Sequence, residues 1–189
     1  MCTISTAAAA LDLSLGELAQ ERAAHDLGLA EASYLDRCRR KTASLFSASC
    51  RLGALLGGAG DDAQRRLAGF GAAVGMAFQI FDDILDLVGA PSATGKRRGA
   101  DLRDGTVTLP LILAMRQEPG LAAEIRGAAD PAAREALCDR LAVHPGTADA
   151  RERALRYVRE ARSALDGPLD GADRAALTAI ADGVVDRYA

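Results

Sequence analysis

Three aspartates stand close together in an otherwise apolar stretch of the sequence. Positions 78–88 read F-Q-I-F-D-D-I-L-D-L-V, and the apolar residues recur so closely that a helix here would be apolar nearly all the way round. Asp82 and Asp86 are four residues apart, and Asp83 and Asp86 are three apart. Their carboxylates therefore project from neighbouring turns, where like charges repel each other.

A buried charge without a partner is costly, which indicates that a cation is held beside these aspartates. Oxygen ligands with no His or Cys close by favour a hard cation. A few carboxylates that leave positions open for water and phosphate oxygens suit Mg²⁺ better than a closed calcium site. The alternative interpretation is that the three side chains face solvent at one end of a helix.

Lys41 and Lys96 are the only lysines of the chain, which otherwise uses arginine as its cation. Lys41 precedes Thr42 within a helical stretch, and Lys96 lies in the polar, glycine-rich segment that follows the aspartates. A compact ammonium group on a flexible stem can meet a phosphate oxygen that already bridges to a metal ion. Two ordinary surface lysines are the alternative.

The elements that position these residues are predicted to be helices throughout. Apolar residues recur at helical spacing, and the breaks fall at Gly, Pro and Asp clusters that end and begin helices. Abundant alanine and the absence of Trp favour closely packed helices over a sheet. We expect helices over residues 7–27, 33–56, 61–88, 148–165 and 173–188, shorter ones beginning near 109, 121 and 130, and a polar loop over 92–106.

Composition restricts the class of protein further. A chain of 189 residues with 49% hydrophobic positions fits one domain, residues 1–189, with a real core. The net charge of -3 argues against a nucleic-acid-binding protein. The cysteines form no CxxC pair, so we expect neither a zinc site nor disulfides, and a cytoplasmic location. The apolar N-terminal run lacks a cationic start, so we expect neither a signal peptide nor a membrane span.

Several ordered motifs resemble those of the trans-isoprenyl diphosphate synthases, also called polyprenyl synthetases. They are G-E-L-A-Q at 16–20, R-K-T-A-S-L-F at 40–46, F-Q-I-F-D-D-I-L-D at 78–86, G-K at 95–96 and D-L-R-D-G-x-x-T-L-P at 101–110. The resemblance covers nearly the whole chain. It implies an all-α helical bundle of the isoprenoid synthase type and an enzyme that uses Mg²⁺ to condense an allylic diphosphate with isopentenyl diphosphate.

The resemblance assigns metal binding to one aspartate-rich motif and shows that another is missing. Asp82, Asp83 and Asp86 match the metal-binding aspartates of the family's second such motif, with Asp82 as a direct ligand and Asp86 acting through water. The family's first motif, with its basic residues for isopentenyl diphosphate, has no match before position 78, because the acidic pair at 61–62 is expected only to cap a helix. We therefore interpret the chain as the C-terminal half of a synthase, without the N-terminal helices of the bundle.

The remaining carried-over roles concern the diphosphate and the allylic cation. Lys41 and Lys96 match lysines that bind the departing diphosphate, and Thr42 and Gln79 match polar groups whose oxygens face the developing cation. Thr106 is a departure, because many short-chain members have a lysine at this position. One cation that faces the diphosphate is therefore lost, and a medium or long product is favoured.

Two functions of different class follow from this interpretation. In the first, the chain is a prenyltransferase that turns over poorly alone and works as a homodimer or as a hetero-oligomer with a chain that supplies the missing half. In the second, it is a non-catalytic subunit that adjusts a complete synthase, although retained aspartates and lysines speak against this. A terpene cyclase would need a downstream Asn/Ser/Glu metal triplet, which residues 110–189 lack.

Overall fold

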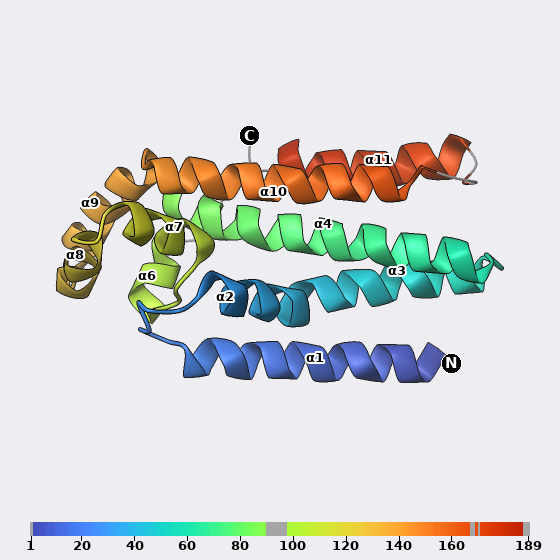
Figure 1. Cartoon of the computed structure of the whole chain (residues 1–189), viewed down its shortest axis with the longest axis horizontal. Coiled ribbons are helices and arrows are strands. Elements are labelled where there is room, and N and C mark those ends of the chain that lie inside the picture. Colours follow the sequence, from blue (N-terminus) through green and yellow to red (C-terminus); the bar gives the residue numbers. More distant parts are fainter. Residues whose placement is uncertain (1, 90–97, 167–168, 170, 187–189) are drawn as a thin grey trace.

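The computed structural model describes residues 2–89, 98–166, 169 and 171–186. All regular elements within these residues are helices, as the sequence predicts, and the fold class is all-α (Figure 1). In chain order they are α1 (Cys2–Arg22), α2 (Glu31–Cys38), η1 (Arg39–Ala43), α3 (Ser44–Leu56), α4 (Asp61–Val88), α6 (Ala100–Asp104), α7 (Leu109–Gln117), α8 (Leu121–Gly127), α9 (Pro131–Ala142), α10 (Pro145–Ala164) and α11 (Gly171–Asp186).

Helix α4 runs through the middle of the bundle, with α3 packed on one side and α10 on another (Figure 1). It has the bounds and the apolar character that the sequence predicts for residues 61–88. Its buried large side chains include Phe70, Val74, Ile80, Phe81 and Leu87. The three aspartates near its C-terminal end are therefore carried by a helix that is packed on several sides.

Two glycines allow α4 to approach its neighbours closely. A Cβ atom on Gly71 would lie 2.4 Å from the carbonyl oxygen of Phe46 in α3, and one on Gly75 would lie 2.7 Å from the Cα atom of Ala43 in η1. Because these atoms belong to the backbone, no side chain can turn aside to make room. Helix α4 therefore packs almost backbone to backbone against α3 and η1.

We expect Gly71→Ala to lower the free energy of unfolding by about 1–3 kcal/mol, because the added methyl group overpacks the α3–α4 contact. Gly69→Ala is the matched control, since Gly69 lies in the same helix and an added Cβ there meets nothing within 4 Å. It should be neutral or stabilising by up to about 1 kcal/mol, through helix propensity. Urea unfolding followed by circular dichroism measures both, and equal stabilities would contradict the packing.

Some boundaries differ from those expected, because contacts far apart in the sequence decide them. The first helix ends at Arg22 instead of near residue 27, and the chain then bends at His25, which has a φ of 64°. The His25 N–H donates to the Gly105 carbonyl oxygen at 2.7 Å. The second expected helix is interrupted by η1, a π-helix. The expected polar loop contains α6, while residues 92–97 and 187–189 lie outside the described residues.

Helix α1 lies along the edge of the bundle, against α2, η1 and α3 (Figure 1). Its residues Leu11, Leu15 and Leu18 recur at helical spacing and are 61%, 40% and 51% exposed. They form an apolar stripe along the outer side of the helix. None of the described helices is both long enough and apolar enough to cross a membrane.

Candidate active site

The three aspartates near the C-terminal end of α4 lie in different environments, because successive residues of a helix point about 100° apart. Asp82 is exposed, Asp86 is partly buried, and Asp83 is buried with 6% of its surface exposed. The sequence could not distinguish them, since all three stand among apolar neighbours. Asp82 is therefore the carboxylate of this motif that a ligand can reach most easily.

Asp83 accepts two hydrogen bonds inside the bundle. The Tyr34 hydroxyl donates to Oδ2 at 2.6 Å, and the Gln79 amide Nε2 donates to Oδ1 at 2.9 Å. Burial raises the pKa of Asp83 to about 6, although both hydrogen bonds lower it. Asp83 is thus a buried carboxylate whose charge is disfavoured by its surroundings even with two donors in place.

Thr42 and Gln79, both predicted from the sequence, lie in direct contact. The Thr42 hydroxyl donates to Gln79 Oε1 at 2.6 Å. Because the Gln79 amide accepts at one end and donates to Asp83 at the other, both ends of the amide have fixed partners. A continuous chain of hydrogen bonds therefore links η1 to the buried aspartate of α4. The role of these oxygens toward an allylic cation stays a prediction.

Asp86 binds the backbone at the start of α6. Its two carboxylate oxygens accept from the N–H groups of Ala100 and Asp101, each at 3.0 Å, and its carbonyl oxygen accepts from the Gly99 N–H at 2.8 Å. Burial raises the pKa of Asp86, and the backbone donors of α6 partly oppose this. Asp86 therefore positions the segment that brings Asp101 to the end of α4.

Asp101 is a member of the site that the sequence analysis did not single out. It lines the same cavity as Asp82 and Asp83, and burial, followed by the charges of Asp83, Asp86 and Asp82, raises its pKa to about 8. The only available signal was its place at the start of the D-L-R-D-G motif. Its proximity to α4 depends on the hydrogen bonds to Asp86, which the sequence does not reveal.

The π-helix η1 carries Lys41 and Thr42, and π-turns are frequent at functional sites. Helix α1 packs closely here, since a Cβ atom on Gly16 would lie 2.6 Å from the Lys41 backbone nitrogen. The Lys41 Nζ atom lies 3.2 Å from a Glu17 carboxylate oxygen and donates to Gln20 Oε1 at 3.1 Å. Helix α1 thus holds both the backbone and the ammonium group of Lys41. Lys96, the other predicted diphosphate ligand, lies outside the described residues.

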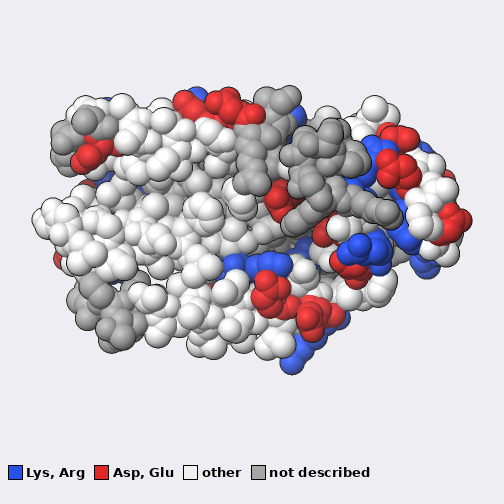
Figure 2. Space-filling model, turned by 180° about the vertical axis from the view of Figure 1, so that it is seen from behind, with Lys and Arg blue, Asp and Glu red and all other residues white. Residues whose placement is uncertain are grey.

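A cavity of about 110 Å³, which we call the acidic cavity, joins these side chains. It is bounded by carboxylates from α4 and α6 and by cations from α2 and η1. Its lining residues are Gln20, Arg37, Cys38, Lys41, Gln79, Asp82, Asp83, Asp101 and Thr106. On the face drawn in Figure 2, much of the charge gathers toward the end of the molecule that carries α6–α9. Acid, cation and hydroxyl groups thus meet in one small space.

The donor set of the acidic cavity fits Mg²⁺. As they stand, the described residues include no group of three His, Cys, Asp or Glu side chains that could hold a metal ion. Asp83 and Asp86 accept hydrogen bonds from internal donors. The available acids are all carboxylates, as a hard cation requires. Burial is the main reason why the pKa values of Asp83 and Asp101 are raised, and neighbouring carboxylates add to the increase. Asp82 and Asp101 are the carboxylates that would hold the ion.

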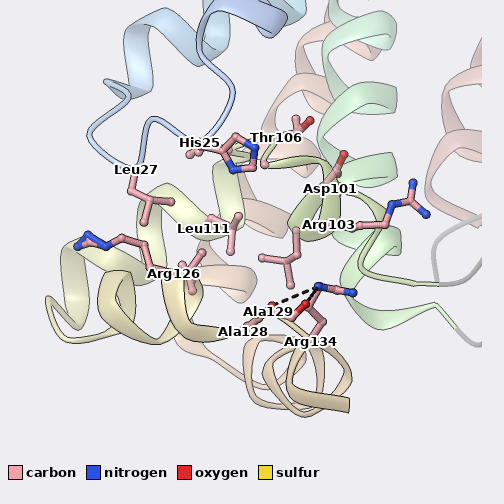
Figure 3. Close-up of a pocket in the computed structure, with 14 residues that line it drawn as sticks. His25, Leu27, Asp101, Arg103, Thr106, Leu111, Arg126, Ala128, Ala129 and Arg134 are labelled. Carbon is pink, nitrogen blue, oxygen red and sulfur yellow. Dashed lines mark hydrogen bonds between the residues drawn. The ribbon is translucent and has the colours of Figure 1, made fainter. Parts of the chain in front are cut away.

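A larger cavity of about 280 Å³ adjoins α6 and shares Asp101 and Thr106 with the acidic cavity (Figure 3). Its wall combines apolar side chains with three arginines, Arg103, Arg126 and Arg134. The Arg134 guanidinium donates to the carbonyl oxygens of Ala128 and Ala129. In Figure 3 the side chains of Asp101 and Thr106 point away from Arg134. We therefore place the candidate active site in the acidic cavity, where the chemically distinctive groups converge.

Comparisons with known proteins find similarity in sequence and in structure. The family model described as Polyprenyl synthetase matches residues 2–139. Heptaprenyl diphosphate synthase component 2 of Geobacillus stearothermophilus is 45% identical over 108 residues, which are 57% of this chain and 34% of that protein. Nonaprenyl diphosphate synthase of Mycobacterium tuberculosis is 38% identical over 161 residues, which are 82% of this chain and 48% of that protein.

Solved structures of similar fold cover the whole chain. Heptaprenyl diphosphate synthase of Staphylococcus aureus has a TM-score of 0.93 at 27% identity, over 100% of this chain and 60% of that one. Polyprenyl synthase of Caulobacter crescentus, in complex with calcium and isoprenyl diphosphate, has a TM-score of 0.93 at 32% identity, over 100% of this chain and 59% of that one. The chain thus spans about half or less of the two curated relatives and about three fifths of the two structures.

Proposed function

Because the chain belongs to the polyprenyl synthetase family, we propose that it carries the metal- and diphosphate-binding half of a prenyltransferase. The reaction would join an allylic diphosphate to isopentenyl diphosphate and release diphosphate. The observation that supports this most strongly is the acidic cavity, where Asp82 and Asp101 lie together with Lys41. Bound Mg²⁺ would supply positive charge that stabilises the departing diphosphate.

The chain's own residues would bind the diphosphate and keep the allylic group in place. Lys41 would exchange its contacts with Glu17 and Gln20 for phosphate oxygens, a change that needs only side-chain rotation. Thr42 and Gln79, fixed by their mutual hydrogen bond, would present oxygens to the positive charge that develops on the allyl group.

Turnover would require an assembly, either of two copies or with a second kind of chain. Two observations support this part of the proposal: one relative is named as component 2 of its enzyme, and α1 exposes an apolar stripe. The partner would supply the residues that hold isopentenyl diphosphate. A second chain would also cover the leucines of α1.

A product assay tests the proposal. The chain would be incubated with Mg²⁺, isopentenyl diphosphate and allylic diphosphates of increasing length, alone and co-expressed with the part of the Staphylococcus aureus enzyme that it does not match. Size-exclusion chromatography would establish that the complex forms, and mass spectrometry would identify products. We expect prenyl diphosphates from the complex only. Products from the chain alone would contradict the need for a partner. A complex that forms but yields no product would contradict the proposed prenyltransferase activity.

A non-catalytic subunit that adjusts a complete synthase is the second candidate, favoured by the similarity to a protein named as one component of a synthase. Asp82→Ala distinguishes the two candidates. In the prenyltransferase, the substitution abolishes the activity of the complex. In the adjusting subunit, it leaves the activity of the complex unchanged, because the acidic cavity then takes no part in the reaction.

We also propose that residues 1–189 form one domain that works in the cytoplasm. The larger of two hydrophobic clusters extends from Tyr34 in α2 to Val184 in α11, and the smaller one packs α7, α8 and α9 against Leu87 of α4, which supports the single domain. Cys38, Cys50 and Cys138 are free thiols, as expected in a reducing compartment.

A further inference from the structure

One buried cation of the acidic cavity has an unused hydrogen-bond donor. The Arg37 side chain in α2 is 5% exposed, and it lines the cavity. Its Nη2 donates to the Val107 carbonyl oxygen at 2.7 Å, while its guanidinium carbon lies 5.2 Å from the centre of the Tyr34 ring. Its Nη1 is buried and has no hydrogen-bond partner in the part of the chain that the structure describes. A buried donor without an acceptor is costly, so it indicates an accepting ligand.

The neighbouring carboxylates do not satisfy this donor. The oxygens of Asp83 accept from Tyr34 and Gln79 instead. Arg37 is nevertheless close enough to act on the acids of the cavity through its charge. Burial raises the pKa of Asp83 and of Asp101, and the charge of Arg37 opposes the increase in both. Arg37 is thus a fixed positive charge in the cavity, and its Nη1 atom is available to donate hydrogen bonds.

Arg37 lies in the same cavity as position 106, where this chain has threonine in place of a cation. Val107, whose carbonyl oxygen receives the Arg37 bond, directly follows Thr106, and Thr106 lines the same cavity. Thr106 stands where many family members have a lysine that faces the diphosphate. The guanidinium of Arg37 therefore shares the acidic cavity with position 106, although α2 lies far from this position in the sequence.

We propose that Arg37 binds the diphosphate of the allylic substrate and so replaces the lysine that is absent at position 106. The inference rests on the proposed function, since it names a further ligand of the same substrate. A guanidinium group suits this task, because its planar donors bind phosphate oxygens and it keeps its charge when buried. The bond to Val107 holds the group in place, which leaves Nη1 for the phosphate.

Isothermal titration calorimetry of the full chain with inorganic diphosphate, in the presence of Mg²⁺, tests this inference. We expect Arg37→Met to raise the Kd about tenfold or more, which is the loss typical of a hydrogen bond to a charged group. The double variant R37M/T106K should recover affinity to within about threefold of the wild type, since a lysine ammonium then supplies the charge. A purely structural role for Arg37 would not be rescued by a lysine at position 106.

Controls separate the possible failures. Arg39→Met removes an exposed arginine that pairs with Asp36, and it should leave the Kd unchanged. Thermal denaturation monitors folding, and Arg37→Gln, which keeps a donor for Val107, replaces Arg37→Met in both experiments if the latter does not fold. The proposed role of Arg37 is overturned if the variant without the charge binds diphosphate with the wild-type Kd. It is also overturned if the double variant does not recover the affinity for diphosphate. If the wild type itself binds no diphosphate, the proposed function fails first.

Discussion

Replacing Asp101 by Asn should stabilise the metal-free chain at about pH 8 by a few kcal/mol and should reduce the loss of stability with rising pH. Burial, with the charges of Asp83, Asp86 and Asp82, raises the pKa of Asp101 to about 8. At about pH 8 the folded chain therefore either keeps a proton on this carboxyl or bears an unfavourable charge. Asparagine has a similar shape and no charge, so the variant avoids that cost.

The sign of the pH dependence follows from the two raised pKa values. In the unfolded chain, both carboxyls titrate near pH 4. In the folded chain, burial raises the pKa of Asp83 to about 6 and that of Asp101 to about 8. Between about pH 4 and about pH 8 the folded state therefore binds more protons than the unfolded state, and the free energy of unfolding falls as the pH rises. The stabilising contribution of these two carboxyls is fully present below about pH 4. It is lost as the pH rises through their folded-state pKa values of about 6 and about 8.

Urea unfolding at about pH 5 and about pH 8, in buffer with a chelator, measures this effect. Asp104→Asn is the matched control, because Asp104 is exposed in the same short helix and pairs with Arg103, which lowers its pKa. It should change stability by less than about 0.5 kcal/mol at either pH. If Asp101→Asn behaves like this control, Asp101 does not carry the negative charge that the site is inferred to gather.

Lys41→Met should weaken Mg²⁺-dependent binding of inorganic diphosphate about tenfold to a hundredfold, because a charge-assisted contact to a phosphate oxygen is lost. The stability of the chain should change little. The partly exposed ion pair of Lys41 with Glu17 contributes no more than about 1 kcal/mol. Calorimetry measures the Kd, and chemical unfolding measures the stability.

Arg40→Met is the control for this prediction. Arg40 adjoins Lys41 in η1, but its ion pairs with Asp36 and Asp12 lie outside the acidic cavity. Its replacement should leave the diphosphate Kd unchanged. Equal Kd values for the two variants would contradict the assignment of Lys41 to the diphosphate.

The sequence was sufficient for those features that depend on local pattern. The apolar periodicity of residues 61–88 predicted α4 with its observed bounds, because a helix buried on several sides needs apolar residues in nearly every direction. The short helix expected to begin near residue 130 is α9, where Asp130 accepts from the Ala133 N–H at 2.9 Å and Pro131 is the first residue. Thr42 and Gln79 were both predicted as site residues, but the hydrogen bond between them was not predicted.

Long-range contacts explain what the sequence could not reveal. Asp83 points inward because Tyr34, 49 residues earlier, donates to it. Asp86 accepts hydrogen bonds from the backbone at the start of α6, whose residues come 14 and 15 positions later. The π-turn of η1 lies where Gly16 and Gly75 bring two other helices against its backbone, and no local propensity signals such packing. In the sequence, nothing distinguishes Arg37 from the other arginines. Only the fold shows that Arg37 lines the acidic cavity.

The most direct test of the central claim is calorimetric titration of the chain with inorganic diphosphate, with and without Mg²⁺, in the wild type and in Asp82→Ala. The account predicts binding by the wild type only when Mg²⁺ is present, and loss of that binding in Asp82→Ala, because Asp82 is the most accessible carboxylate of the cavity. Binding that is independent of Mg²⁺, or that is unchanged in Asp82→Ala, would contradict the assignment of the acidic cavity as the metal and diphosphate site.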